Sequence, residues 1–294
     1  MTTTTDRERR IGLGVWLVDK PAGPTSHDVV ARIRRGVGRG VKVGHTGTLD
    51  PFATGLLVVV TGKATRLTPY LTALSKRYTA RIRLGATSPT GDPEGPVTET
   101  GAPIPDSGAI DAAVADLVGE NRQRVPAYSA VKVDGVALHR RTRRGEVARA
   151  PDRTITITDA RRIGSSDDGS WLDLDVTCSK GTYIRQLAAD LGDTLGCGAY
   201  CTGLRRTAVG TLTVDDAVDV EAVPDAGYVN PLRAIADLPR RELGPEELAA
   251  VRHGQSVTWD GPGHPDSVAL VSDDAIVAIG TAADDILKPR VVLV

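Results

Sequence analysis

The chain has 294 residues, of which 40% are hydrophobic and 25% are charged, a composition typical of globular proteins with a sizeable core. No stretch approaches the roughly 18 consecutive apolar residues of a membrane span, which excludes a membrane protein built on such helices. The net charge of −1 gives no sign of a uniformly basic, nucleic-acid-coating protein.

The first 60 residues predict a short strand, a helix and a second strand. The opening MTTTTDRERR has no apolar stretch, so we expect no secretory signal and a disordered tail over residues 1–10. GVWLVDKP predicts a strand that ends in a turn, and Ser26 is the expected N-cap of the next helix. The run LLVVVT (56–61) is typical of a buried strand.

From residue 78 onward, strands and helices mix without a repeated strand–helix–strand order. YTARIRL alternates apolar and polar residues, as do RTITITDARRI and WLDLDVTC, so each predicts a half-buried strand. Residues 109–119 and 181–192 predict helices, and YCTGLRRTAVGTLTV predicts a strand pair. This order favours an α+β fold with a mixed, largely antiparallel central sheet over a parallel α/β sheet.

A proline-containing segment at 230–243 is a candidate linker. Beyond it, GPEELAAVRHGQ predicts one short helix, and the remaining residues alternate as strands. We therefore expect a main domain over residues 11–236 and a small, mostly β domain over 237–294. The smaller unit is near the lower size limit for independent folding, so it should pack on the main domain.

Charge is distributed unevenly along the chain. Residues 1–163 contain 26 Lys and Arg against 16 Asp and Glu, whereas residues 164–294 contain 10 against 21. The densest basic stretch is LHRRTRRGEVAR, with Arg140, Arg141, Arg143, Arg144 and Arg149. Such a stretch can be a solvated face or a surface for a polyanion, and the asymmetry suggests one polyanion-facing side.

Several familiar catalytic motifs are absent from the sequence. GLLVVVTGKAT resembles a phosphate-binding loop, but its glycines are too far apart and Ala64 stands where Ser or Thr would bind magnesium. No G-x-S-x-G or H-E-x-x-H occurs, and the five histidines are scattered. The three cysteines form no C-x-x-C pair, which favours buried thiols in a reducing cytoplasm over a metal site.

One acidic residue stands out in GHTGTLDPFATG (44–55). Asp50 is the only acidic residue between Asp28 and Asp92. An Asp-Pro pair often does no more than open a turn. An aspartate beside an arginine instead stays ionised and can act as a nucleophile or a base. The segment CSKGTYIR offers such an arginine, Arg185, together with Lys180 and Tyr183.

At this point the sequence resembles the TruB-type tRNA pseudouridine synthases, which isomerise the T-loop uridine at tRNA position 55. The resemblance covers most of residues 13–210 and rests on segments in the family's order: DKPAGPTSHDVV, GHTGTLDPFATGLLVV, KRYTARIRLG with the later TGDPEG, VPAYSAVKVDGVALHRRTRRGE and CSKGTYIRQLAADLG.

The resemblance implies roles for the residues of these motifs. Asp50 would be the essential carboxylate and Arg185 its ion-pair partner. Tyr78 would stack on the target base and help to remove the final proton. Tyr183 and Leu204 would line the base pocket.

Further residues would contact or accommodate the RNA. His45 would fill the space that the nucleotide vacates when it flips out, and Lys20 and Lys180 would bind substrate. Residues 124–149 would form a basic insertion that grips the T stem-loop through its arginines. The C-terminal segment is similar in position to the family's PUA-type RNA-binding domain, although it is shorter than usual.

The reaction that the resemblance implies requires neither a cofactor nor a metal, because nothing is oxidised and no group leaves the site. We expect a cytoplasmic monomer whose partner is tRNA. Two rivals remain open: a catalytically silent RNA-binding or chaperone module, and a synthase of a neighbouring family that works with guide partners. The presence of Asp50, Tyr78 and Arg185 argues against the first.

Overall fold

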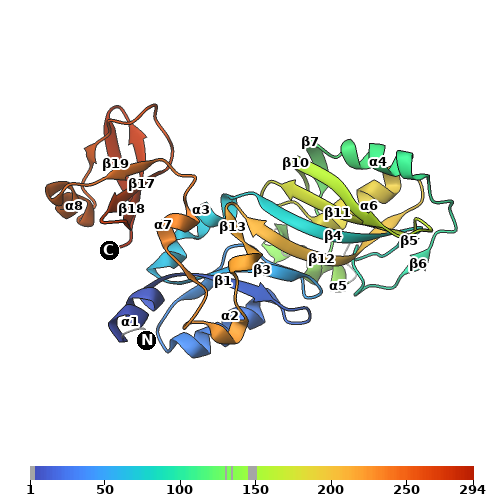
Figure 1. The fold of residues 1–294 in the computed structure, drawn as a ribbon, viewed down its shortest axis with the longest axis horizontal. Helices are drawn as coiled ribbons and strands as arrows, with labels where there is room; N and C mark the ends of the chain where they lie inside the picture. The colour runs from blue at the N-terminus through green and yellow to red at the C-terminus, as the bar shows by residue number, and fades with distance from the viewer. Residues whose placement is uncertain (1–3, 130, 134, 145–150) are drawn as a thin grey trace.

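The computed structural model describes residues 4–129, 131–133, 135–144 and 151–294, and it contains a large twisted sheet and a smaller C-terminal sheet (Figure 1). In spatial order the main strands of the large sheet are β14 (Tyr228–Val229), β1 (Leu13–Lys20), β3 (Thr54–Gly62), β12 (Ala199–Val209), β4 (Lys76–Leu84), β11 (Trp171–Cys178), β10 (Asp152–Ser165) and β7 (Gly119–Arg124).

Two short strands extend this sheet, β2 (Val43–His45) beside β3 and β13 (Leu212–Thr213) beside β12. The pairing of β3 with β12 is parallel, and the other pairings of the sheet are antiparallel. Two small hairpins lie outside it, formed by β5 (Ala86–Thr87) with β6 (Thr98–Glu99) and by β8 (Lys132–Val133) with β9 (Val136–Ala137). The expected α+β fold with a mixed, largely antiparallel sheet is confirmed.

Helices cover the sheet mainly on one face. The α-helices of the main domain are α1 (Thr4–Gly12), α2 (Ser26–Val37), α3 (Thr68–Ala73), α4 (Ser107–Ala115), α5 (Leu138–Arg143), α6 (Ile184–Thr194) and α7 (Pro231–Ala234). Short 3-10 turns occur at η1 (Lys63–Leu67), η2 (Val214–Asp216) and η3 (Val220–Ala222). Apolar residues of α2, α4 and α6 share one core with the inner face of the sheet, which places these three helices on that face.

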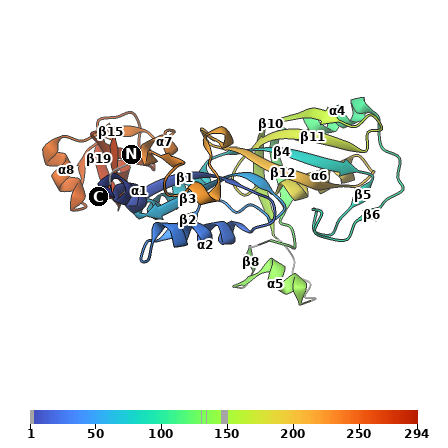
Figure 2. The ribbon, with the colours of Figure 1, turned by 60° about the horizontal axis from the view of Figure 1, so that its bottom comes forward.

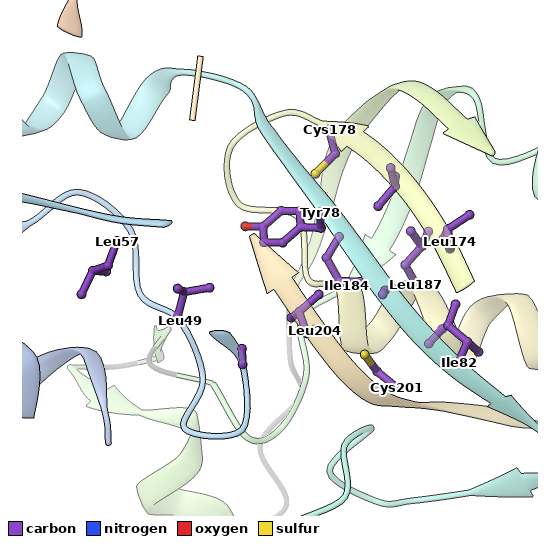
Figure 3. Close-up of a cluster of buried hydrophobic side chains, with 14 of the residues drawn as sticks. Leu49, Leu57, Tyr78, Ile82, Leu174, Cys178, Ile184, Leu187, Cys201 and Leu204 are labelled. Carbon is purple, nitrogen blue, oxygen red and sulfur yellow. The ribbon is translucent and has the colours of Figure 1, made fainter. Parts of the chain in front are cut away.

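The strand β4 shows how the alternating pattern creates this core. Its residues are buried and exposed in turn, with Tyr78, Ala80 and Ile82 facing inward. Figure 3 shows Tyr78 and Ile82 in one apolar cluster with Leu187 of α6 and Leu204 of β12. On the outer face, arginines of β4 pair with aspartates of β11, as Arg81 does with Asp173 at 2.8 Å.

The C-terminal segment forms its own five-stranded sheet. Its strands, in spatial order, are β15 (Arg240–Glu242), β17 (Val268–Ser272), β18 (Ala275–Ala283), β19 (Ile286–Val292) and β16 (Val257–Thr258), with α8 (Pro245–Arg252) beside them. Val271 and Ile279 of this sheet share a core with Val15 and Val60 of the main sheet. The expected small, mostly β unit therefore docks on the main domain through apolar contacts.

The N-terminus differs from expectation. A disordered tail was predicted over residues 1–10, but Thr4–Gly12 form α1, while residues 1–3 lie outside the described part. Arg7 pairs with Asp225 at 3.2 Å, and Ile11 is buried in the main core. Among the described side chains, the buried Ile11, this ion pair and Arg10, which lies 5.2 Å from the centroid of the Tyr228 ring, hold the helix, so no amphipathic repeat predicted it.

The N-cap of α2 is Thr25 rather than the expected Ser26. Thr25 and Asp28 form a capping box, in which each side chain accepts a hydrogen bond from the other residue's backbone N–H. Ser26 is instead the first helical residue and is buried. Its hydroxyl donates to the carbonyl of Leu49 at 3.0 Å and accepts from the N–H of Leu49 at 2.9 Å. Ser26 therefore fixes the loop that carries Asp50.

No helix in the described part of the chain is both long enough and apolar enough to cross a membrane.

Candidate active site

A cavity of about 670 Å³ opens where four loops meet the ends of β4 and β12. The residues that line it come from distant parts of the sequence and include Ser26, His27, Asp50, Lys76, Tyr78, Tyr128, Tyr183, Arg185, Leu204 and Arg206. A cavity of this size is within the range of ligand-binding pockets. The structure thus brings together five of the eight residues predicted for chemistry and substrate binding: Asp50, Tyr78, Arg185, Tyr183 and Leu204.

Lys20 contacts the loop that carries Asp50 and supports it through hydrogen bonds. The ammonium group of Lys20 donates to the carbonyls of Pro21, Pro24 and Pro51, at 2.8, 2.7 and 3.2 Å. Lys20 is completely buried, and burial lowers its pKa, although the nearby Asp50 carboxylate opposes that shift. With its three donors used, Lys20 supports the loop and does not line the cavity.

Asp50 forms an ion pair with Arg185 from the first turn of α6. The Nε of Arg185 donates to Asp50 Oδ2 at 2.8 Å, and Nη2 lies 3.4 Å from Oδ1. The side chain of Arg185 is only 5% exposed. It also reaches the carbonyls of Thr90 and Tyr128 and the carboxylate of Asp92. Arg185 therefore joins α6 to three other segments, which contain Asp50, Thr90 with Asp92, and Tyr128.

Asp92 was not predicted as a site residue. Its carboxylate lies 3.2 Å from Arg185 Nη1 and is 5% exposed, whereas the Asp50 side chain is 34% exposed. Two carboxylates thus share one buried guanidinium, and Asp50 is the one that a molecule in the cavity can reach. Asp92 lies in the TGDPEG loop, and no local pattern indicates that this loop folds over Arg185.

Tyr78 lies at the apolar wall of the cavity. Burial raises the pKa of its hydroxyl, and the positive charge of Arg206 opposes this effect. Figure 3 shows the hydroxyl pointing away from Ile184 and Leu187, toward the side where Leu49 and Leu57 lie. The site thus offers an aromatic ring in an apolar wall with its polar end beside a cation.

Two buried cations beside Tyr78, Lys76 and Arg206, were also not predicted as site residues. Arg206 is 2% exposed and donates to the carbonyls of Leu56 and Gly47, at 2.7 and 3.0 Å. Lys76 donates to the carbonyls of Thr72 and Leu74. Burial, followed by the charge of Arg206, lowers the pKa of Lys76 to about 8. Lys76 and Tyr78 are two apart in β4, and Leu204 and Arg206 are two apart in β12. Residues two apart in a strand point to the same face, so this alternation could have indicated that both cations face the cavity.

His45 and Lys180 lie beside the cavity and are not among its lining residues. The His45 ring packs edge-on against His27, with centroids 5.5 Å apart, and its Nδ1 accepts from the N–H of Gly47. Burial, with the nearby His27 and Arg206, lowers the pKa of His45 to about 4. His45 is therefore neutral near pH 7. Lys180 is exposed next to the Tyr183 loop.

The predicted basic insertion is described only in part. Arg140 and Arg141 belong to α5, and Arg144 follows it. The side chain of Arg143 and all of Arg149 lie outside the described residues. In Figure 2, α5 and β8 stand apart from the main sheet, so this segment extends from the body of the protein.

Within the described residues, no three His, Cys, Asp or Glu side chains are grouped to hold a metal ion.

Comparisons with known proteins match most of this chain to one family. Residues 34–184 match the TruB family pseudouridylate synthase N-terminal domain, and residues 185–247 match the tRNA pseudouridylate synthase B C-terminal domain. The tRNA pseudouridine synthase B of Arthrobacter sp. (strain FB24) is 43% identical over 95% of this chain and 96% of its own. That of Thermobifida fusca (strain YX) is 46% identical, over 90% and 92%.

Solved structures show the same fold. An H/ACA RNP bound to a substrate RNA containing 2′-deoxyuridine includes a chain that superposes with a TM-score of 0.77 at 25% identity. A Cbf5-Nop10-Gar1 complex includes one with the same score at 28% identity. Each match covers 98% of this chain and 87% of the other. The chain belongs to the TruB family of tRNA pseudouridine synthases, which are isomerases that act on RNA.

Proposed function

We propose that this enzyme converts the T-loop uridine at tRNA position 55 to pseudouridine, with Asp50 as the acting carboxylate and with no cofactor. The observation that carries the proposal is the Asp50–Arg185 ion pair at the cavity. The buried guanidinium lies 2.8 Å from the carboxylate and orients it, while the 34% exposure of Asp50 leaves it accessible to a nucleotide.

The reaction balances within the nucleotide itself. The bond between N1 and C1′ breaks, the uracil turns, and a bond forms between C5 and C1′. The proton on C5 is lost and N1 gains a proton, so no oxidant and no external group is consumed. Asp50 supplies a carboxylate oxygen for this rearrangement, held beside the buried guanidinium of Arg185.

The cavity has the features that a flipped base requires. A uridine inside a folded loop must leave its stack before an enzyme can reach C1′. Tyr78 and Tyr183 offer aromatic faces to the base, and Leu204 offers an apolar contact. Tyr78 stands where its hydroxyl can take part in the final proton transfer. We also propose that His45, which packs against His27 beside the cavity, fills the space that the flipped nucleotide vacates.

The T stem-loop would be held outside the cavity by the basic half of the chain. Arg140, Arg141, Arg143, Arg144 and Arg149 belong to the proposed gripping segment, and the exposed Lys180 adds a cation beside the Tyr183 loop. Contacts of this type go mainly to phosphates and fix the position of the RNA. Lys20 contributes indirectly, by holding the Asp50 loop.

The test is to map pseudouridine in tRNA directly. Carbodiimide-treated tRNA from cells that lack this protein should lose the reverse-transcription stop at position 55, and expression of the wild-type protein should restore it. A stop that persists without the protein, or a lost stop at another position, would contradict the proposal.

We also propose a cytoplasmic monomer. The three buried free thiols support a reducing compartment, and size-exclusion chromatography with light scattering tests the oligomeric state.

A further inference from the structure

Gln123, a residue outside the cavity, holds the main chain of Tyr183 at both ends. It lies in β7 and is 1% exposed. Its Nε2 donates to the carbonyl of Tyr183 at 3.0 Å, and its Oε1 accepts from the N–H of Tyr183 at 2.8 Å. Tyr183 is the N-cap of α6 and makes no side-chain cap. The Gln123 amide therefore fixes, from β7, the main-chain N–H and C=O of a residue whose own side chain makes no cap.

Arg153 holds the same residue from the side of its ring. Its guanidinium carbon lies 5.2 Å from the centroid of the Tyr183 ring, a cation–π distance. Its Nη1 donates to the carbonyl of Gly181 at 3.0 Å. A β-carbon on Gly181 would lie only 2.8 Å from that nitrogen, and Gly181 has a φ of +82°. The loop before α6 is therefore closely fitted around this arginine.

Gln123 and Arg153 stand directly opposite each other in the antiparallel pair of β7 and β10. Side chains at opposite positions point to the same face, so one cross-strand pair contacts both the backbone and the ring of Tyr183. The same two strands lead into and out of residues 125–151. Within that segment the carbonyl of Tyr128 accepts from Arg185 Nη2 at 3.1 Å.

We propose that Gln123 and Arg153 are positioning residues for the isomerisation. They fix Tyr183 and the start of α6, and through α6 they fix Arg185, which lies two residues after Tyr183 and binds Asp50. This inference rests on the proposed roles of Tyr183 and Arg185. Small displacements of groups that orient a reacting centre lower the rate of chemistry more than they weaken substrate binding, and this difference makes the proposal testable.

The first test replaces Gln123 by glutamate. Gln123→Glu keeps the shape and the acceptor, but it removes the donor and places a carboxylate against the Tyr183 carbonyl. We expect the single-turnover rate at saturating tRNA to fall at least tenfold, with the dissociation constant for tRNA within threefold of wild type. The control is Asn121→Asp, because Asn121 lies in the same strand and its amide also donates to main-chain carbonyls, those of Leu117 and Gly119. It should keep the wild-type rate.

The second test does not depend on Gln123→Glu folding well. Arg153→Lys keeps the charge but loses the planar group over the ring, whereas Arg161→Lys makes the same change elsewhere in β10. We expect a rate loss of fivefold or more only for Arg153→Lys. In a Tyr183→Leu background, Arg153→Lys should cost less than twofold further, because the ring it positions is gone.

The two proposals can fail separately. A wild-type enzyme that makes no pseudouridine in tRNA contradicts the proposed function. An active wild type with unchanged rates in folded Gln123→Glu and Arg153→Lys overturns the positioning role alone. So does an Arg153→Lys effect that is equally large with and without the Tyr183 ring, or one that appears only in the dissociation constant, as expected of a phosphate contact.

Discussion

Arg185 lies between two carboxylates that differ in access to the cavity. Asp92 is 5% exposed and serves as an internal counter-charge, whereas Asp50 is 34% exposed. Because a buried guanidinium without a partner is costly, Asp92 would keep Arg185 paired if Asp50 changed its contacts during the proposed reaction. Two chemically identical side chains thus differ here in their exposure to the cavity.

Replacement of Asp50 tests the central assignment. Asp50→Asn retains the shape of the side chain and removes its charge, so pseudouridine formation should fall below detection while tRNA binding stays within about tenfold. Asp173→Asn is a matched control, since Asp173 also pairs with an arginine but on the outer face of the sheet. The measurement is tritium release from C5-labelled tRNA by purified protein. Turnover in Asp50→Asn would show that another group performs the chemistry.

Tyr78 combines a ring with a hydroxyl, and Tyr78→Phe separates the two. The ring remains to stack on the base, so tRNA binding should be unchanged. Product formation should slow by about 10²- to 10⁴-fold, the usual contribution of a group that transfers a proton. Tyr70→Phe is the control, because Tyr70 is a half-buried tyrosine in α3 away from the cavity lining. Wild-type rates in Tyr78→Phe would leave only the stacking role.

His45 should make stability depend on pH. Its pKa is lowered from 6.5 to about 4 in the folded protein, so between these values the unfolded chain binds more protons. Stability is therefore complete above pH 6.5 and falls as the pH drops toward 4, by about 3 kcal/mol for this group. Urea unfolding of His45→Gln across this range should show a weaker pH dependence than wild type. The control is the exposed His253→Gln, whose pH dependence of stability should equal that of wild type. If all three proteins showed the same pH dependence, the lowered pKa of His45 would be contradicted.

At the scale of elements, alternation predicted the strands well and the site only in part. The pattern of YTARIRL identified β4, and the same period of two places Lys76 beside Tyr78 and Arg206 beside Leu204. Arg205, one residue away, faces outward and binds Asp19. Arg206 binds the carbonyls of Leu56 and Gly47, which are far away in the sequence, whereas Lys76 binds those of Thr72 and Leu74 just before β4. Neither residue was predicted to be buried, since basic residues are usually exposed.

Helix boundaries were predicted wrongly where one or two tertiary contacts decide them. Thr25 and Ser26 are both good N-cap residues, and only the capping box with Asp28 and the contact of Ser26 with Leu49 distinguish them. The short α1 has one buried apolar residue, Ile11, so periodicity could not reveal it. Local pattern is thus sufficient for elements with a repeating buried face and insufficient for those fixed by one or two tertiary contacts.

The α5 segment should control the salt dependence of binding. Arg140 and Arg144 are exposed, and each arginine that neutralises a phosphate contributes a little under one unit to the slope of log K against log salt. The double variant Arg140→Gln/Arg144→Gln should flatten that slope by about one to two units. Its single-turnover rate at saturating tRNA should stay near wild type, because these residues lie outside the cavity lining. Fluorescence titrations at four salt concentrations measure the slope, and no change would indicate a solvated face.

At the scale of the whole molecule, the uneven charge distribution does not correspond to two separately folded domains. The basic residues 1–163 and the acidic remainder contribute strands to the same large sheet. The C-terminal sheet joins the main domain through a shared apolar core that includes Val271 and Ile279. If the basic residues bind the RNA as proposed, the acidic C-terminal unit should contribute mainly packing against the main domain.

This view predicts that cations of the C-terminal unit matter little for RNA binding. Lys288 and Arg290 lie two apart in β19, so they share one exposed face. Lys288→Gln/Arg290→Gln removes the same charge as the α5 double variant, yet it should change the slope of log K against log salt by less than half a unit, because acidic residues dominate residues 164–294. Equal flattening by the two double variants would show that the RNA reaches the C-terminal sheet and that the acidic half does not repel it. Unfolding midpoints of both variants, measured in the same buffers, separate a lost phosphate contact from a loosened C-terminal sheet.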